Sequence, residues 1–284
     1  MALETTIVVH GLPAPINLEV ARECEASVRK GGATAATVGV FDGRVVVGLN
    51  AEQLEALADP ERHAAKLSAR DLGTALATGT DGATTVAGTI TVAHRVGIDV
   101  MATGGLGGVH RHATTTFDES ADLTTLARTP VLVVASGVKS ILDIPATLER
   151  LDSLGVPVVG FATRQFPGFY RRDSGYTLDW AVASAEEAAA AFLRHREFST
   201  TGFLVANPVA PESELDQRLH DEALASALEK TQLDGVSGKA VTPALLAEFA
   251  RHTAGVSVLV NRDLVVANAA LAGEIATSLA NALP

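Results

Sequence analysis

Lys139 has the residue type and the position of a nucleophile. It closes a run that begins at Pro130 and contains five consecutive aliphatic residues, Val131 to Ala135, which predict a strand buried on both faces. Open α/β sheets bind ligands beyond the carboxyl ends of their strands, and a half-buried amine there can lose its proton and attack a sugar carbonyl. The alternative is a lysine whose stem packs on the protein while its head group reaches solvent.

A glycine-rich segment upstream of Lys139 could bind an anion. Four glycines and then three basic or imidazole side chains follow a predicted strand at Asp99–Thr103: Gly104, Gly105, Gly107, Gly108, His110, Arg111 and His112. Glycines let backbone N–H groups turn toward an anion, although such a loop can also be purely structural. The spacing matches neither the dinucleotide fingerprint nor a Walker loop, and the basic side chains favour a phosphate or another substrate group.

Two carboxylates follow this segment, Asp118 and Asp122. One of them could bind a divalent cation together with waters and a substrate phosphate, which suits Mg²⁺ or Mn²⁺, while the other carries a proton or contacts substrate. The alternative is local, with Ser120 or Asp118 capping a short helix that runs through Leu126. The histidines and the single cysteine do not have the spacing of a structural zinc site.

Two further charged residues lie apart from these groups. Glu4 stands at the entrance of the predicted first strand, and Lys66 precedes Leu67 and Ser68. Composition alone predicts a solvated surface charge for both.

Strand-like and helix-like segments alternate along nearly the whole chain. The predicted strands are Thr5–His10, Ala36–Phe41, Arg44–Val47, Asp99–Thr103, Pro130–Ser136, Val158–Phe161 and Gly202–Ala206. The predicted helices are Ile16–Arg29, Ala51–Ala58, Ala69–Ala77, Thr85–Arg95, Ala146–Leu154, Ser184–Arg196, Glu212–Thr231, Pro243–His252 and Leu264–Ala280. This alternation predicts an α/β protein with a mostly parallel sheet covered by helices, and Asp42-Gly43 predicts one tight hairpin. No linker or repeat divides the chain, so we expect one domain over residues 1–284.

The composition restricts the partners. Hydrophobic residues make up 47% but aromatic residues only 4%, which indicates an aliphatic core typical of a layered sheet-and-helix protein. A net charge of -11 argues against nucleic acid. The single cysteine and the absence of a signal sequence predict a cytoplasmic protein. No apolar run approaches the roughly 18 residues of a membrane span, so no membrane partner is expected.

Several separate blocks together resemble one enzyme family, the pseudouridine-5′-phosphate glycosidases. The blocks occur in order along nearly the whole chain: Ala2 to Ile7, His10 to Pro13, Gly82 to Ala87, Ala102 to His110, Phe117 to Leu123, Lys139 to Asp143 and Val205 to Pro208. The resemblance implies a three-layer α/β/α core, a homotrimer, and reversible cleavage of the C-glycosidic bond to uracil and ribose 5-phosphate.

The resemblance also implies a role for each matching residue. Lys139 matches a nucleophile that forms an imine with C1′ of the ring-opened ribose, Glu4 a proton donor, and Asp118 a ligand of Mn²⁺. Further positions match substrate contacts: Lys66, Val86, Ser120, Ala121 and Asp122. Four more are expected in the pocket by position: Thr85, Thr103, His110 and Asn261.

Some positions depart from the family pattern. Glu4 lies almost at the start of the chain, where chains fray, so neighbouring packing must hold it. The other departures are expected to flank the pocket and bear on substrate choice: Ala69, His112, Thr114 and Val138. Two alternatives therefore stay open. One is a related synthase that joins ribose 5-phosphate to an aromatic acceptor in natural-product assembly, and the other is a non-catalytic sugar-phosphate or nucleotide-binding protein that kept the fold.

Overall fold

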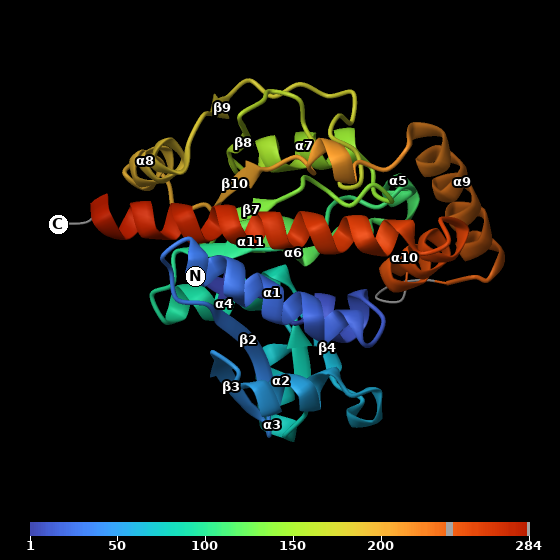
Figure 1. Ribbon diagram of the computed structural model, residues 1–284, viewed down its shortest axis with the longest axis horizontal. Coiled ribbons are helices and arrows are strands. Elements are labelled where there is room, and N and C mark those ends of the chain that lie inside the picture. Colours follow the sequence, from blue (N-terminus) through green and yellow to red (C-terminus); the bar gives the residue numbers. More distant parts are fainter. Residues whose placement is uncertain (237–240, 283–284) are drawn as a thin grey trace.

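A computed structural model describes residues 1–236 and 241–282 and shows one mixed sheet between two layers of helices (Figure 1). The sheet has ten strands in the order β4-β5-β2-β1-β6-β7-β10-β8-β9, with β3 paired to β2. Their bounds are β1 Ala2–Leu3, β2 Ala36–Phe41, β3 Arg44–Val47, β4 Ala65–Leu67, β5 Gly82–Thr84, β6 Val100–Ala102, β7 Leu132–Ala135, β8 Val158–Phe161, β9 Ala181–Val182 and β10 Phe203–Ala206. All pairs are parallel except β2 with β3 and β2 with β5, which confirms the mostly parallel sheet.

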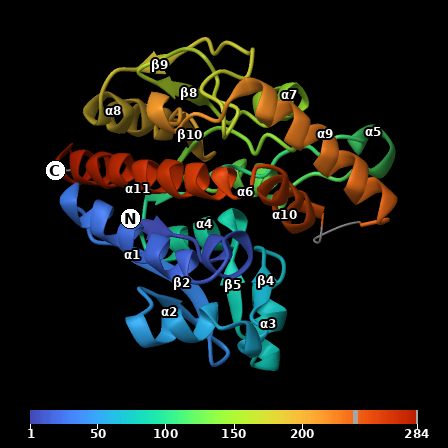
Figure 2. The ribbon, with the colours of Figure 1, turned by 45° about the vertical axis from the view of Figure 1, so that its right-hand side comes forward.

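Helices cover both faces of the sheet (Figures 1 and 2). Their bounds are α1 Ile16–Lys30, α2 Ala51–Ala58, α3 Leu72–Thr78, α4 Val86–Arg95, α5 Ala113–Thr116, α6 Ala121–Leu126, α7 Ile144–Ser153, α8 Ala185–Arg196, α9 Gln217–Leu233, α10 Val241–His252 and α11 Val256–Ala282. Short helical turns are η1 Ile7–Gly11, η2 Pro60–Arg62 and η3 Pro211–Ser213.

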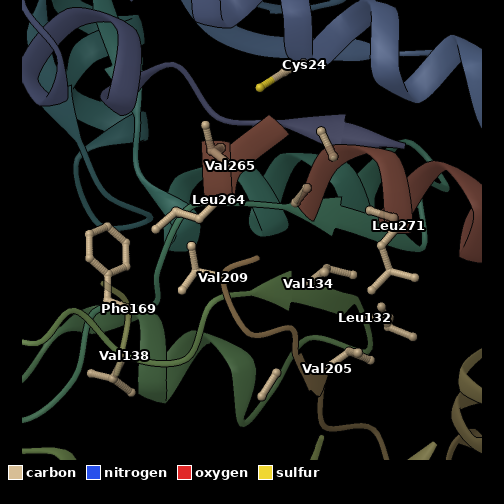
Figure 3. Close-up of a cluster of buried hydrophobic side chains, with 14 of the residues drawn as sticks. Cys24, Leu132, Val134, Val138, Phe169, Val205, Val209, Leu264, Val265 and Leu271 are labelled. Carbon is tan, nitrogen blue, oxygen red and sulfur yellow. The ribbon is translucent and has the colours of Figure 1, made fainter. Parts of the chain in front are cut away.

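Alternate residues of the central strands face two separate cores. In β6, Val100 and Ala102 join the core beneath α1, α8 and α11, whereas Met101 joins the core with α4 and α6. Figure 3 shows the first core, which contains Leu264 and Leu271 of α11 together with Val134 of β7. Because side chains alternate along a strand, burial on both faces requires a helix layer on each side. The three-layer α/β/α architecture is therefore confirmed. One domain over residues 1–284, which include residues 237–240 and 283–284 outside the described part, stays a prediction.

The predicted first strand, Thr5–His10, is wrong. The strand β1 ends before it, and most of the predicted segment forms the π-helical turn η1. Thr5 leaves the ladder because its hydroxyl donates to the Val38 carbonyl at 2.8 Å and accepts from the Thr84 N–H at 2.9 Å. Its carbonyl accepts from the Val8 N–H at 3.0 Å, which starts the turn. Side-chain hydrogen bonding thus overrides an aliphatic run that would otherwise suit a strand.

Several element boundaries also differ from the prediction. The strands β4, β5 and β9 have two or three residues each and were not predicted. The helix expected from Glu212 begins at Gln217, because a 3₁₀ turn at η3 precedes it. The last helix begins at Val256 rather than Leu264 and is therefore 27 residues long.

This last helix corrects one expectation about membranes. By length and composition α11 could cross a bilayer, with a mean hydropathy of 1.3 in its most apolar window, contrary to the prediction that no such segment exists. However, 56% of that window is buried inside the protein, and α11 packs on α1, α8, β6 and β7. A core helix passes the same test, so this feature is weak support for a membrane span.

Candidate active site

A cavity of about 290 Å³ opens where β1, β6 and β7 end. Glu4 follows β1, the glycine-rich segment follows β6, and Lys139 lies beyond β7. All twelve residues predicted for the site line this cavity: Glu4, Lys66, Thr85, Val86, Thr103, His110, Asp118, Ser120, Ala121, Asp122, Lys139 and Asn261. The fold therefore brings together groups that the sequence separates by more than 250 positions, while their individual roles stay predictions.

Glu4 is held in place although it lies near the start of the chain. The preceding strand β1 pairs with β2 on one side and β6 on the other. The terminal ammonium of Met1 donates to the Thr34 carbonyl at 2.8 Å. The Thr103 hydroxyl donates a short hydrogen bond to Oε1 of Glu4. Neighbouring packing thus fixes the carboxyl group at the cavity wall.

The surroundings of Glu4 favour its protonated form. Burial raises the pKa of this carboxyl above its usual value, and the negative charge of Asp122 raises it further. The positive charge of Lys139, the Thr103 hydroxyl and the charge of Lys66 act in the opposite direction but do not reverse the shift. A raised pKa suits a carboxyl group that donates a proton.

Lys139 lies against the glycine-rich segment, four residues beyond the end of β7. Its Nζ atom donates to the Gly105 carbonyl at 2.7 Å, and its backbone N–H donates to the Leu106 carbonyl at 3.2 Å. Gly105 allows the Phe169 ring to pack closely, because a Cβ there would lie 2.5 Å from Cδ2 of Phe169 and 3.3 Å from Cγ of Lys139. Lys139 is partly buried and lines the cavity, while its role as a nucleophile stays a prediction.

Asp122 joins the glycine-rich segment to the start of α4. Its Oδ1 accepts from the Ala87 N–H at 2.9 Å, and its Oδ2 accepts from the Gly107 N–H at 3.0 Å. The side chain is buried, and Ser120 caps α6 as predicted, with its Oγ accepting from the Asp122 N–H. The carboxylate therefore orients two backbone segments of the cavity.

The predicted metal position contains one carboxylate. Oδ2 of Asp118 lies 3.9 Å from Nδ1 of His110, and burial lowers the pKa of that imidazole, with Lys66 and Lys139 lowering it further and Asp118 opposing. The Asp118 side chain is 37% exposed. Among the described residues, no group of three or more His, Cys, Asp or Glu side chains could hold a metal ion. A hard cation there would need water and substrate oxygens to complete its coordination.

Other cavity residues were not predicted. They come from η1 and the residue before it, from the segments after β4 and after β8, and from α10. Examples are Thr6, Ile7, His10, Gly11, Ser68, Arg70, Phe169, Thr242, Pro243 and Leu246. Of these, Thr6, Ile7, His10 and Gly11 lie in blocks that resemble the family, and no role was attached to them. The four departures from the family pattern do not line the described cavity, and His112 adopts a positive φ of 126° beside it.

Comparison with known proteins decides the family. The model of the family described as "Indigoidine synthase A like protein" matches residues 1–278. The chain belongs to this family. A pseudouridine-5′-phosphate glycosidase of Salinispora tropica is 56% identical over 282 residues, which cover 99% of this chain and 87% of the relative. One of Streptomyces griseus is 54% identical over 286 residues, covering 99% and 88%. The resemblance inferred from the sequence is thereby confirmed.

Two solved structures share the fold. An indigoidine synthase A-like protein from Thermotoga maritima superposes with a TM-score of 0.91 at 38% identity, covering 98% of this chain and 92% of that one. The prealnumycin C-glycosynthase AlnA, in complex with ribulose 5-phosphate, superposes with a TM-score of 0.90 at 37% identity, covering 99% and 91%. Relatives in this family therefore act on C-glycosidic bonds and include one that binds a pentulose phosphate.

Proposed function

We propose that this chain is an enzyme that reversibly cleaves the C-glycosidic bond of pseudouridine 5′-phosphate, giving uracil and ribose 5-phosphate. The observation that carries the proposal is the convergence on one cavity of Lys139 and Glu4, a carboxyl group whose pKa burial raises. The names of relatives at 54–56% identity support the choice of substrate.

The chemistry requires a nucleophile and an acid together, because a carbon leaving group cannot be released by protonating a heteroatom. In its neutral form the Lys139 amine attacks C1′, and the ring oxygen leaves that carbon and takes up a proton. The nitrogen lone pair then forms the C1′=N bond as the bond from C1′ to C5 of uracil breaks, and C5 takes its proton from Glu4. Water hydrolyses the imine, which releases ribose 5-phosphate and regenerates the amine.

The remaining wall suits the sugar phosphate. Lys66 supplies a cationic side chain, and Val86 supplies the first N–H of α4, which has no acceptor among the described residues. We assign Mn²⁺ to Asp118, whose exposed carboxylate suits a cation that also binds water and phosphate, and the ion would neutralise phosphate charge. A homotrimer and a cytoplasmic location complete the proposal.

A product assay with pseudouridine 5′-phosphate, with and without Mn²⁺, tests the activity. Borohydride added with ribose 5-phosphate should reduce the imine, so Lys139 should gain the mass of the sugar phosphate less one oxygen atom. Lys139→Ala should lose both turnover and adduct while remaining folded, because its amine makes a single hydrogen bond to Gly105. Lys30→Ala, at the exposed end of α1, is the matched control and should keep both. Turnover by Lys139→Ala, or an adduct elsewhere, would exclude the mechanism.

The second candidate is C-glycoside synthesis with an aromatic acceptor. It is favoured by the likeness to a C-glycosynthase and by the unusual backbone at His112. Turnover of ribose 5-phosphate with uracil should be compared with turnover using larger phenolic acceptors. Exclusive use of uracil would eliminate the synthase, and tight ribose 5-phosphate binding without any turnover would indicate a non-catalytic binding protein.

A further inference from the structure

Asn268 connects the ends of three adjacent strands beneath the cavity. It lies on α11, is fully buried, and does not line the cavity itself. Its Nδ2 group donates to the Thr103 carbonyl at 2.9 Å, the Gly104 carbonyl at 3.3 Å and the Ser136 hydroxyl at 3.1 Å. Its Oδ1 accepts from Nδ2 of Asn207 at 2.9 Å. One side chain thus joins the residues that follow β6, β7 and β10.

The segment from Thr103 to Gly105, which Asn268 contacts, also forms hydrogen bonds with Glu4 and Lys139. The Thr103 hydroxyl donates to Glu4, and the Gly105 carbonyl accepts from Nζ of Lys139. Gly104 lies between these two contacts, and its carbonyl accepts from Asn268 and from the Ser136 N–H. A shift of this short segment would move the acid and the amine at once, because each is bonded to it.

We propose that Asn268 is a positioning residue that sets the separation of the Glu4 carboxyl group from the Lys139 amine. The inference rests on the proposed function of those two residues. An amide suits the position because it donates to carbonyls and accepts from Asn207 with the same group. Leucine would fill a similar volume but would leave the Thr103 carbonyl without its donor, while the Gly104 carbonyl would keep the Ser136 N–H at 2.9 Å. Asn261, which lines the cavity, lies seven residues earlier on the same face of α11. The same helix therefore contributes one residue to the cavity wall and one that contacts the strand ends.

The test compares Asn268→Leu with the wild type well below their melting temperatures. We expect kcat to fall by at least about 30-fold, with KM within threefold and borohydride trapping of ribose 5-phosphate slowed in parallel. The Thr103 hydroxyl lowers the pKa of Glu4, so loosening that hydrogen bond should move the alkaline limb of the kcat profile to higher pH. Asn207→Ala, which removes one hydrogen bond to Oδ1 of Asn268, should show the same pattern more weakly and serves if Asn268→Leu does not fold.

Thr231→Val is the matched control, since it removes one buried hydrogen bond to the Ala227 carbonyl within α9, away from Glu4 and Lys139. It should lower the melting temperature without changing kcat or the pH profile. Variants at Asn268 and Asn207 that keep wild-type kcat, or that lose activity through KM alone with the alkaline limb unmoved, would overturn the proposal. If the wild type shows neither turnover nor adduct, the proposed function is refuted, and the role of Asn268 with it. If the wild type is active and both variants have the same kcat, only the role of Asn268 is refuted.

Discussion

Asp122→Ala should remove a large part of the protein's stability. The carboxylate is 6% exposed and accepts two backbone hydrogen bonds, from Ala87 at 2.9 Å and Gly107 at 3.0 Å. A hydrogen bond to a charged group contributes about 1.5–3 kcal/mol, and the substitution leaves the buried N–H of Ala87 and the part-buried N–H of Gly107 without this acceptor. The expected loss is therefore about 3–6 kcal/mol, a large fraction of the roughly 5–15 kcal/mol that stabilises a typical protein.

Thermal unfolding measured by circular dichroism checks this magnitude. At about 2–4 °C per kcal/mol for larger domains, the melting temperature should fall by roughly 10 °C. Asp143→Ala is a matched control, because Asp143 accepts a single N–H, from Ala146 at 3.0 Å, at the partly exposed start of α7. Loss of that cap should cost only about 1 kcal/mol. Equal losses of stability in the two variants would show that the two hydrogen bonds to Asp122 do not contribute as calculated.

Asp122→Asn removes the negative charge of this residue while keeping a side chain of nearly the same size and shape. The negative charge of Asp122 raises the pKa of Glu4, so its removal lowers that pKa and deprotonates the acid at lower pH. The alkaline limb of the profile of kcat/KM against pH should therefore move to lower pH. An unmoved limb would show that Glu4 is not the group that must be protonated, or that Asp122 does not act on it.

Two further variants test the acid and the metal. Glu4→Gln should lower kcat by about 10²–10⁴-fold. Because burial raises the folded-state pKa of Glu4, its contribution to stability is present at acidic pH and lost as pH rises, so Glu4→Gln should melt above the wild type at pH 8 but not at pH 4. Asp118→Ala should abolish stimulation by Mn²⁺ and weaken binding of the ion in the presence of ribose 5-phosphate, measured by the electron paramagnetic resonance signal of free Mn²⁺. Undiminished Mn²⁺ binding would contradict the assignment.

The parts of the fold that could be predicted are those with a strong local pattern. The run around β7 consists of aliphatic residues that all become buried, and Ser120 precedes a short helix that it caps. The strand β4 contains Lys66 and has three residues, so no periodicity marks it. The first strand was placed too late because Ile7, Val8 and Val9 look like a strand, whereas the hydroxyl of Thr5 bonds elsewhere.

The site could be predicted where a block of sequence carries a reactive group, as with Lys139. The rest of the cavity depends on tertiary packing. Phe169 reaches it from the segment after β8, and Leu246 from α10, neither with any local pattern that indicates a site. Asn268 shows the same difficulty, because an asparagine within an apolar helix has no feature in the sequence that marks it as a link between strand ends.

The arrangement of charges around Glu4 explains why a buried aspartate accompanies the acid and the amine. If Glu4 transferred its proton to Lys139, the resulting ion pair would disable both groups, because a carboxylate cannot donate and an ammonium cannot attack. Burial opposes that ion pair by raising the pKa of Glu4, and the charge of Asp122 adds to the effect, while Lys139 itself opposes it. Two backbone N–H groups donate to the Asp122 carboxylate and fix it at the cavity wall. Asp122→Asn should therefore favour the unreactive ion pair and slow the reaction most strongly at alkaline pH.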